Sequence, residues 1–283
     1  IKKHNSLILS SGNSVTKEST IEYKENPITK TVMKIDSCSI AGFESPSIQK
    51  ENQDKFFIVQ NFLDDPSQFF LGVCDGHGVY GHLVSEYVTK TLPKYIKDIS
   101  VETIKNSFNQ INNNLLNNPK IDCSLSGSTC TSLIILDNKI ISINLGDSRA
   151  VLARYKNGKY NAIDLSRDHK PKDIDEMKRI IIKGGRIGQY YDKEVKEFVG
   201  PERVWIKNSN IPGLAMSRSF GDNLAHSVGV ISEPEIKTFD YNGTEKFIVL
   251  ASDGIWEYID SDECVNIVKD HYEKDKDAIA ALN

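Results

Sequence analysis

The stretch FFLGVCDGHGVYGH, residues 69–82, changes character at a single residue. Its apolar first half is typical of a buried strand, and the strand pattern ends at Asp75, which is followed by Gly76 and His77. An aspartate and a glycine after a strand most often form a turn. The same pair also suits a hard cation, because the aspartate supplies an oxygen ligand and the glycine lets the backbone come close. The other strand ends of the chain distinguish these two possibilities.

Three further aspartates lie beside predicted strands. Asp147 follows the strand pattern in IISINLGDSRA, and Asp253 follows the one in FIVLASDGIWE. Asp54 comes just before the strand pattern in ENQDKFFIV. A single case would be read as a turn, but four carboxylates at strand ends indicate a shared function. Since Mg²⁺ and Mn²⁺ prefer oxygen ligands, we predict a metal site built from these residues.

The composition limits the partners and the compartment. The 283 residues carry a formal net charge of -4, which provides no general basic surface for nucleic acid or an anionic membrane. The five cysteines are odd in number and contain no C-x-x-C pair, which argues against a disulfide framework and against a zinc site. No apolar run is long enough to span a membrane. We therefore expect a cytoplasmic or nuclear protein, a monomer, with no nucleic-acid partner and no membrane span.

Hydrophobic patterning predicts one α+β domain. Residues 1–30 are polar and lack sustained periodicity, so we expect an N-terminal extension there and a single domain over residues 31–283. Over residues 131–165, strand patterns are separated by Asp-Asn, Gly-Asp and Asn-Gly pairs. These pairs are typical of antiparallel hairpins rather than of parallel β-α-β units.

Three segments fit helices. Apolar residues recur at helical spacing over residues 81–98 and 101–115, and a capped helix fits DIDEMKRIIIKGG, residues 173–185. In the third segment, Asp173 and Glu176 have the spacing of a capping box, and the glycine pair at its end is a stop signal. The mixture of hairpins and helices supports the α+β class.

Six motifs occur in an order that resembles a known family. They are DGHGVYGH (75–82), SGST (126–129), NLGDSRAVLAR (144–154), DHKP (168–171), GLAMSRSFGD (213–222) and LASDGIWEYI (250–259). Together they resemble the signature of the metal-dependent PPM family, the type-2C serine/threonine protein phosphatases. The resemblance covers residues from about 35 to 270. It implies an α-β-β-α sandwich of two antiparallel sheets flanked by antiparallel helices, with Mg²⁺ or Mn²⁺ at one edge.

The resemblance also implies a role for each strand-end residue. Asp75 matches the aspartate that bridges two metal ions, and the backbone carbonyl of Gly76 matches a ligand of one of them. Asp253 matches a ligand of the other ion, and Asp54 matches an aspartate that binds metal directly or through water. Asp147 matches the ligand of a third, weaker ion that some members bind. Two core ions and an optional third are therefore expected.

The chemistry that follows needs no protein nucleophile. Two cations about 3.5 to 4 Å apart would share a water and lower its pKa, so that the resulting hydroxide attacks phosphorus in line. His77 matches the family's general acid. A cysteine phosphatase needs an arginine six positions after its cysteine, and none of the five cysteines has one. The expected substrates are phosphoserine and phosphothreonine proteins.

Three departures from the family pattern keep a second function open. Gln53 stands where many relatives have a glutamate, and Lys50 is the one cation near the place of the family's phosphate-binding arginine. The sequence stops at DAIAALN, so the last strand with its metal-binding aspartate is expected to be missing. These departures are consistent with a pseudophosphatase, a binding or scaffold module with an incomplete metal site.

Two further features admit a functional and a structural interpretation. Arg218 and Asp222 in SRSFGD either orient elements of the site or form a buried structural pair. Residues 184–204 match a mobile flap beside the site that helps to select phosphoprotein substrates, whereas the basic segment before them also fits a solvated helix face.

Overall fold

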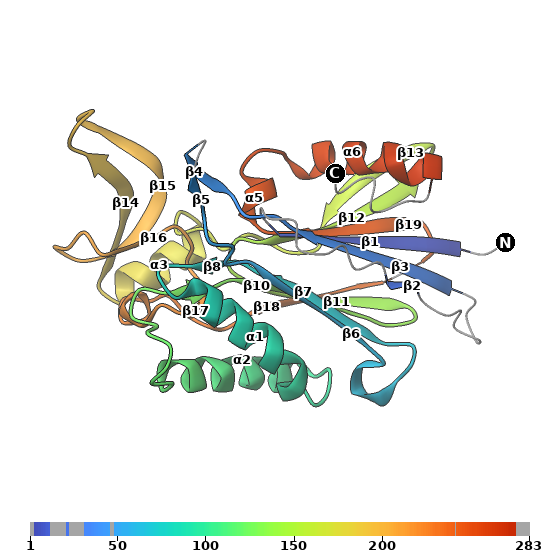
Figure 1. Ribbon diagram of the computed structural model, residues 1–283, viewed down its shortest axis with the longest axis horizontal. Coiled ribbons are helices and arrows are strands. Elements are labelled where there is room, and N and C mark those ends of the chain that lie inside the picture. Colours follow the sequence, from blue (N-terminus) through green and yellow to red (C-terminus); the bar gives the residue numbers. More distant parts are fainter. Residues whose placement is uncertain (1–2, 12–20, 23–30, 46–47, 241, 276–283) are drawn as a thin grey trace.

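Two stacked β-sheets form the centre of the protein, with helices on both outer faces (Figure 1). The computed structural model describes residues 3–11, 21–22, 31–45, 48–240 and 242–275. The order of layers is helices, sheet, sheet, helix, so the α-β-β-α sandwich expected from the resemblance is confirmed.

The five-stranded sheet is antiparallel throughout and carries two helices on its outer face. Its strands, in spatial order, are β18 (Glu235–Asp240), β11 (Lys139–Leu145), β10 (Cys130–Ile135), β7 (Phe69–Cys74) and β6 (Lys55–Gln60). The helices are α1 (Gly81–Tyr95) and α2 (Val101–Leu116), and the short turn η1 (Phe62–Asp64) joins β6 to β7. Both helices lie where the apolar spacing predicts them.

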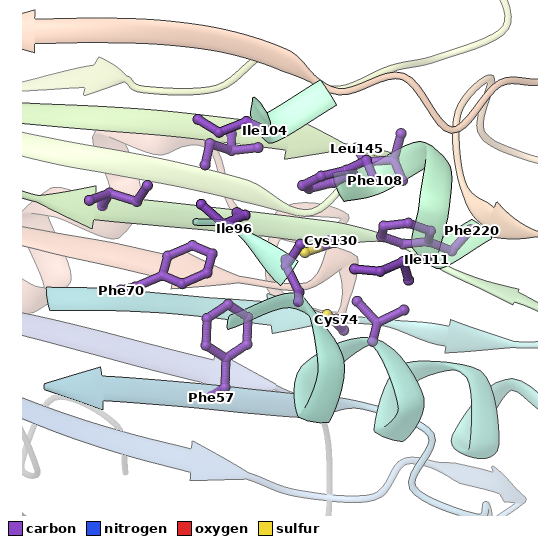
Figure 2. Packing of buried hydrophobic residues seen from close by; sticks show 14 of the residues in the cluster. Phe57, Phe70, Cys74, Ile96, Ile104, Phe108, Ile111, Cys130, Leu145 and Phe220 are labelled. Carbon is purple, nitrogen blue, oxygen red and sulfur yellow. The ribbon is translucent and has the colours of Figure 1, made fainter. Parts of the chain in front are cut away.

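A large apolar cluster joins these helices to the sheet (Figure 2). Phe70 of β7 packs edge-on against Phe57 of β6, with 4.8 Å between ring centroids. Phe108 of α2 stacks on Phe220 at 5.1 Å. Phe70, Phe108 and Phe220 are fully buried, and each contributes about 1.5–3 kcal/mol by leaving water. This cluster holds β7 rigid just before Asp75.

The six-stranded sheet contains both parallel and antiparallel pairs. Its strands, in spatial order, are β13 (Lys159–Asp164), β12 (Arg149–Lys156), β19 (Glu245–Ala251), β1 (Lys3–Ser11), β3 (Thr31–Ser39) and β2 (Ile21–Glu22). Strand β1 runs parallel to both of its neighbours, whereas the other pairs are antiparallel. Residues 3–11, expected in an N-terminal extension, thus form a strand inside a sheet. The domain boundary at residue 31 stays a prediction.

Two further apolar layers complete the sandwich. Residues such as Leu71 of β7 and Leu250 of β19 fill the space between the two sheets. On the other face of the six-stranded sheet, Val265 and Tyr272 of α6 (Ser261–Asp275) pack against Phe247. None of the helices in the described ranges is long and apolar enough to cross a membrane.

A long hairpin projects from one end of the sandwich, at the left of Figure 1. It consists of β14 (Gly185–Asp192) and β15 (Glu197–Ile206), and the short β16 (Pro212–Leu214) pairs with β15. This hairpin occupies most of the segment that sequence matching expects as a flap. The short hairpin of β4 (Phe43–Ser45) and β5 (Ile48–Gln49) precedes β6.

Helix α3 (Ile174–Ile182) precedes the hairpin but does not begin with a capping box. Asp173 occupies the N-cap position without a side-chain hydrogen bond to the helix. Glu176 is fully buried and binds three side chains of the tertiary structure instead. The capping-box prediction is therefore wrong, because two arginines and a serine of the tertiary structure compete for the glutamate more strongly than a helix terminus does.

Candidate metal and catalytic site

Four carboxylates meet at one edge of the sandwich. Asp75 follows β7, Asp147 follows β11, Asp54 precedes β6, and Asp253 begins the short helix α5 (Asp253–Trp256) after β19. Burial and the negative charges of Asp54, Asp253 and Asp147 raise the pKa of Asp75 well above its usual range. Burial and Asp147 raise the pKa of Asp253 to about 6. The structure thus brings together all four aspartates that the sequence predicts for the metal site.

Asp75 lies at the centre of this group, because the negative charges of Asp54, Asp253 and Asp147 all act on its carboxyl. Asp54 also accepts a hydrogen bond from the Ser252 hydroxyl at 2.9 Å. Asp147 binds Lys170, whose Nζ donates to Oδ2 at 2.5 Å. In the described part of the chain, no group of three His, Cys, Asp or Glu side chains is arranged to hold a metal ion as it stands.

The chemistry of the group nevertheless fits a divalent cation. All four side chains offer oxygen ligands. Burial, together with the repulsion between these carboxylates, raises the pKa of Asp75 and of Asp253. A cation relieves the same repulsion more effectively than a proton does. In addition, the Oδ1 atom of Asp147 is buried without a hydrogen-bond partner. Such an atom is suited to receive a ligand.

Gly76 lies where no side chain fits. A Cβ atom there would lie 2.4 Å from the carbonyl oxygen of Gly81 and 2.6 Å from that of Gln53. The Gln53 side chain donates from Nε2 to the carbonyl of Gly78, at 2.8 Å, where φ is +79°. Gln53 therefore supports the loop after β7. This contact gives the residue a structural role where the family has a carboxylate.

His77 is oriented by a carboxylate that sequence reasoning did not assign to it. A small sheet pairs β8 (Gly76–His77) with β9 (Gly127–Ser128), which in turn pairs with β17 (Phe220–Gly221). Asp222 follows β17, and its Oδ2 lies 2.7 Å from Nε2 of His77. Burial lowers the pKa of His77, but the Asp222 carboxylate outweighs burial and raises it. Nδ1 of His77 is buried without a partner.

Asp222 is itself firmly held. It is 2% exposed, and its Oδ2 also accepts a hydrogen bond from the Ser219 hydroxyl at 2.6 Å. Its amide donates to the carbonyl of Ser126 at 2.9 Å. Asp222 and His77 are 145 residues apart in the sequence, so no local sequence pattern predicts their contact. Of the two interpretations of Asp222, the structure supports the one in which it orients an element of the site.

Arg218 has a different partner. Its guanidinium donates to both carboxylate oxygens of Glu176, which also accepts from Arg179 and Ser217 at 2.6 Å each. Burial alone would raise the pKa of Glu176, but these three donors hold it well below its usual range. This cluster fastens α3 to the segment that leads to Asp222. Arg218 and Asp222 therefore do not form the pair considered from the sequence.

A groove with a volume of about 1110 Å³ opens beside Asp147 and Asp253. The basic side chains that line it were not selected from the sequence; they are Arg149, Arg167, Lys170, Lys172 and Lys237. Lys50, predicted to bind phosphate, is exposed on the segment after β5. Its role stays a prediction.

The cysteines do not resemble nucleophiles. None of the five, all of which lie in the described ranges, forms a disulfide. Cys74 is fully buried and belongs to the same apolar cluster as Cys130 (Figure 2). Burial raises the pKa of its thiol well above its usual range. A thiol in this state is inert, because the thiolate is the reactive form.

Comparisons with known proteins agree with the motifs and the fold. The family profile "Protein phosphatase 2C" matches residues 39–282. The chain is 35% identical over 260 residues to "Probable protein phosphatase 2C 35" of Arabidopsis thaliana, covering 85% of this chain and 74% of that protein. It is 34% identical over 249 residues to "Probable protein phosphatase 2C 72" of the same plant, covering 82% and 72%.

Solved structures show the same fold. The serine-threonine phosphatase 2C from Toxoplasma gondii superposes with a TM-score of 0.67 and 16% sequence identity, covering 93% of this chain and 91% of that one. The resemblance found in the six motifs is thereby confirmed. The chain belongs to the protein phosphatase 2C family of serine/threonine phosphatases.

Proposed function

We propose that this protein hydrolyses phosphoserine and phosphothreonine in protein substrates and depends on Mg²⁺ or Mn²⁺. The observation that carries the proposal is the meeting of four aspartates from separate strands, where burial and the neighbouring negative charges raise the pKa of Asp75 and Asp253. Carboxylates clustered at one edge repel one another and destabilise the fold unless a bound cation offsets the repulsion. Asp75, the Gly76 carbonyl, Asp253 and Asp54 would hold two ions, and Asp147 would hold a third.

Divalent cations bound there would supply a water acidic enough to attack phosphorus at neutral pH, and would neutralise the phosphoryl oxygens. The protein's own part is to fix the ligands on rigid strand ends. Asp75 follows a strand that is buried between two apolar layers. The backbone of Gly81 and Gln53 packs closely around Gly76 and keeps the Gly76 carbonyl in place. Such positioning matters, because an error of 1 Å can cost about 10²-fold in rate.

His77 acts as the general acid for the leaving group. A serine or threonine alkoxide is a poor leaving group, so it must be protonated as the phosphorus–oxygen bond breaks. Asp222 engages Nε2 of His77, which leaves Nδ1 as the nitrogen that can donate the proton. The raised pKa of His77, caused by Asp222 against the effect of burial, favours the protonated imidazole.

A rate measurement on a phosphothreonine peptide tests this proposal. We expect turnover with Mg²⁺ or Mn²⁺, and loss of turnover after chelation with EDTA. Asp75→Asn should reduce kcat by at least about 10³-fold, because removing a group that stabilises charge in the transition state costs about that much. Asp262→Asn, the same change at an exposed position on α6, is the control and should match the wild type.

Two results would contradict the proposal. Activity that survives exhaustive chelation, or that survives Asp75→Asn, would exclude a catalytic metal at this edge. Absence of turnover by the wild type with either cation would instead favour the pseudophosphatase, which binds phosphoproteins without hydrolysing them.

A further inference from the structure

Asp147 lies in a turn that the chain holds from a second segment. Gly146, with φ at +107°, donates from its amide to Nδ1 of His169 at 3.1 Å. The His169 amide donates back to the Gly146 carbonyl at 2.9 Å. Because both bonds join the same two residues, the segment around His169 cannot slide along the turn. Lys170, the next residue, therefore starts directly beside Asp147.

The Lys170 side chain makes use of this position. Its Nζ donates to Oδ2 of Asp147 at 2.5 Å. The Asp147 side chain is 2% exposed and that of Lys170 is 29% exposed, so the ammonium group closes the solvent side of a buried carboxylate. The second oxygen, Oδ1, is buried and has no hydrogen-bond partner. One oxygen of Asp147 is thus occupied by a cation that belongs to the chain.

Asp147 is also part of the aspartate group. Its charge contributes to the raised pKa of both Asp75 and Asp253, whose largest cause is burial. A cation bound among these carboxylates would therefore be separated from the Lys170 ammonium group only by the carboxylate of Asp147. In a partly buried site two such charges repel each other appreciably.

We propose that Lys170 is a built-in counter-ion of Asp147, and that a divalent cation binds at Asp147 only in competition with this ammonium group. The inference rests on the proposed function insofar as that function requires divalent cations. In this arrangement Lys170 occupies Oδ2 of Asp147 and leaves only Oδ1 without a partner. By thermodynamic reciprocity, a cation at Asp147 weakens the contact with Lys170 by the same factor.

Direct measurement of Mn²⁺ binding tests the inference without reference to activity. The signal of free Mn²⁺ in electron paramagnetic resonance reports the number of bound ions and the Kd of each class. We expect Lys170→Met to tighten the weakest class by about tenfold, a typical size for coupled sites. Lys172→Met is the matched control, since Lys172 is exposed in the same groove, and it should bind Mn²⁺ as the wild type does.

Two more variants locate the effect. Lys170→Arg keeps the positive charge and should bind Mn²⁺ as the wild type does. Asp147→Asn added to Lys170→Met should abolish the gain, because the ligand itself has been weakened. Lys170→Gln provides the same comparison if circular dichroism shows that Lys170→Met is unfolded.

The outcomes separate this inference from the proposed function. If the wild type binds Mn²⁺ and Lys170→Met binds it no more tightly than Lys172→Met does, the inference is overturned and the proposed function stands. If the wild type binds no Mn²⁺ at any accessible concentration, the metal-dependent function is overturned, and the inference with it.

Discussion

Replacing Glu176 with glutamine tests how the segment that carries Asp222 is held. Glu176 is fully buried, and its two oxygens accept hydrogen bonds from Arg179, Arg218 and Ser217. Glutamine has nearly the same shape but no charge, and its amide nitrogen would face a guanidinium group. The substitution therefore leaves two arginines without their anion in a site where water can scarcely replace it.

The expected loss of stability follows from this geometry. Removing one partner of a buried ion pair costs about 3–5 kcal/mol. We expect about 3 kcal/mol, because the glutamine oxygen still accepts from Ser217 and because Arg179 is partly exposed. Urea unfolding at pH 7 measures this loss. Glu197→Gln, at an exposed position of the long hairpin, is the control and should change stability by less than about 0.5 kcal/mol. A loss below 1 kcal/mol for Glu176→Gln would refute the reasoning.

The same variant has a definite pH dependence. The folded-state pKa of Glu176 lies well below its ordinary value, because the three donors outweigh burial. A carboxylate with a lowered folded pKa adds stability that is complete above its unfolded pKa, about 4.3, and is lost as the pH falls below that value. The stability difference between wild type and Glu176→Gln should thus be constant above pH 5 and shrink on acidification. A difference that grows toward low pH would contradict this sign.

Three further predictions concern the site. His77→Ala should lower turnover of a phosphothreonine peptide by about 10² to 10⁴-fold, and turnover of p-nitrophenyl phosphate far less, since nitrophenolate leaves without a proton; equal losses would withdraw the general-acid role. Cys74→Ala should keep kcat within a few-fold, because the buried thiol is not used; complete inactivation of a folded variant would show that it is. Gly76→Ala should lower kcat by about 10²-fold, because its Cβ meets the backbone of Gly81 and Gln53; unchanged kinetics would mean that this loop need not be rigid.

Much of the fold could be predicted because the signals are local. The helix spacing over residues 101–115 corresponds to α2, Val101–Leu116, and the Asn-Gly pair at residues 157–158 joins β12 to β13 as a hairpin. The place of β1 could not be predicted. It depends on parallel backbone pairing with β19, near the other end of the described chain, and no periodicity within residues 1–30 reports such a partner.

The site shows the same division between local and distant information. Asp75, Asp147 and Asp253 could be selected because each follows an apolar strand directly. Their partners could not, since His77 meets Asp222, and Asp147 meets Lys170, only after the strands have paired. The wrong assignment of Glu176 to a helix cap has the same origin, because its arginine partner on the SRSFGD segment is distant in sequence.

The most direct test of the account is to locate the cations. Crystals grown with Mn²⁺ and measured at the manganese absorption edge would show each ion as an anomalous peak. We predict peaks between Asp75 and Asp253, within direct coordination distance of their carboxylate oxygens. A protein that hydrolyses phosphothreonine peptides while its crystals show no manganese at these aspartates would contradict the central claim.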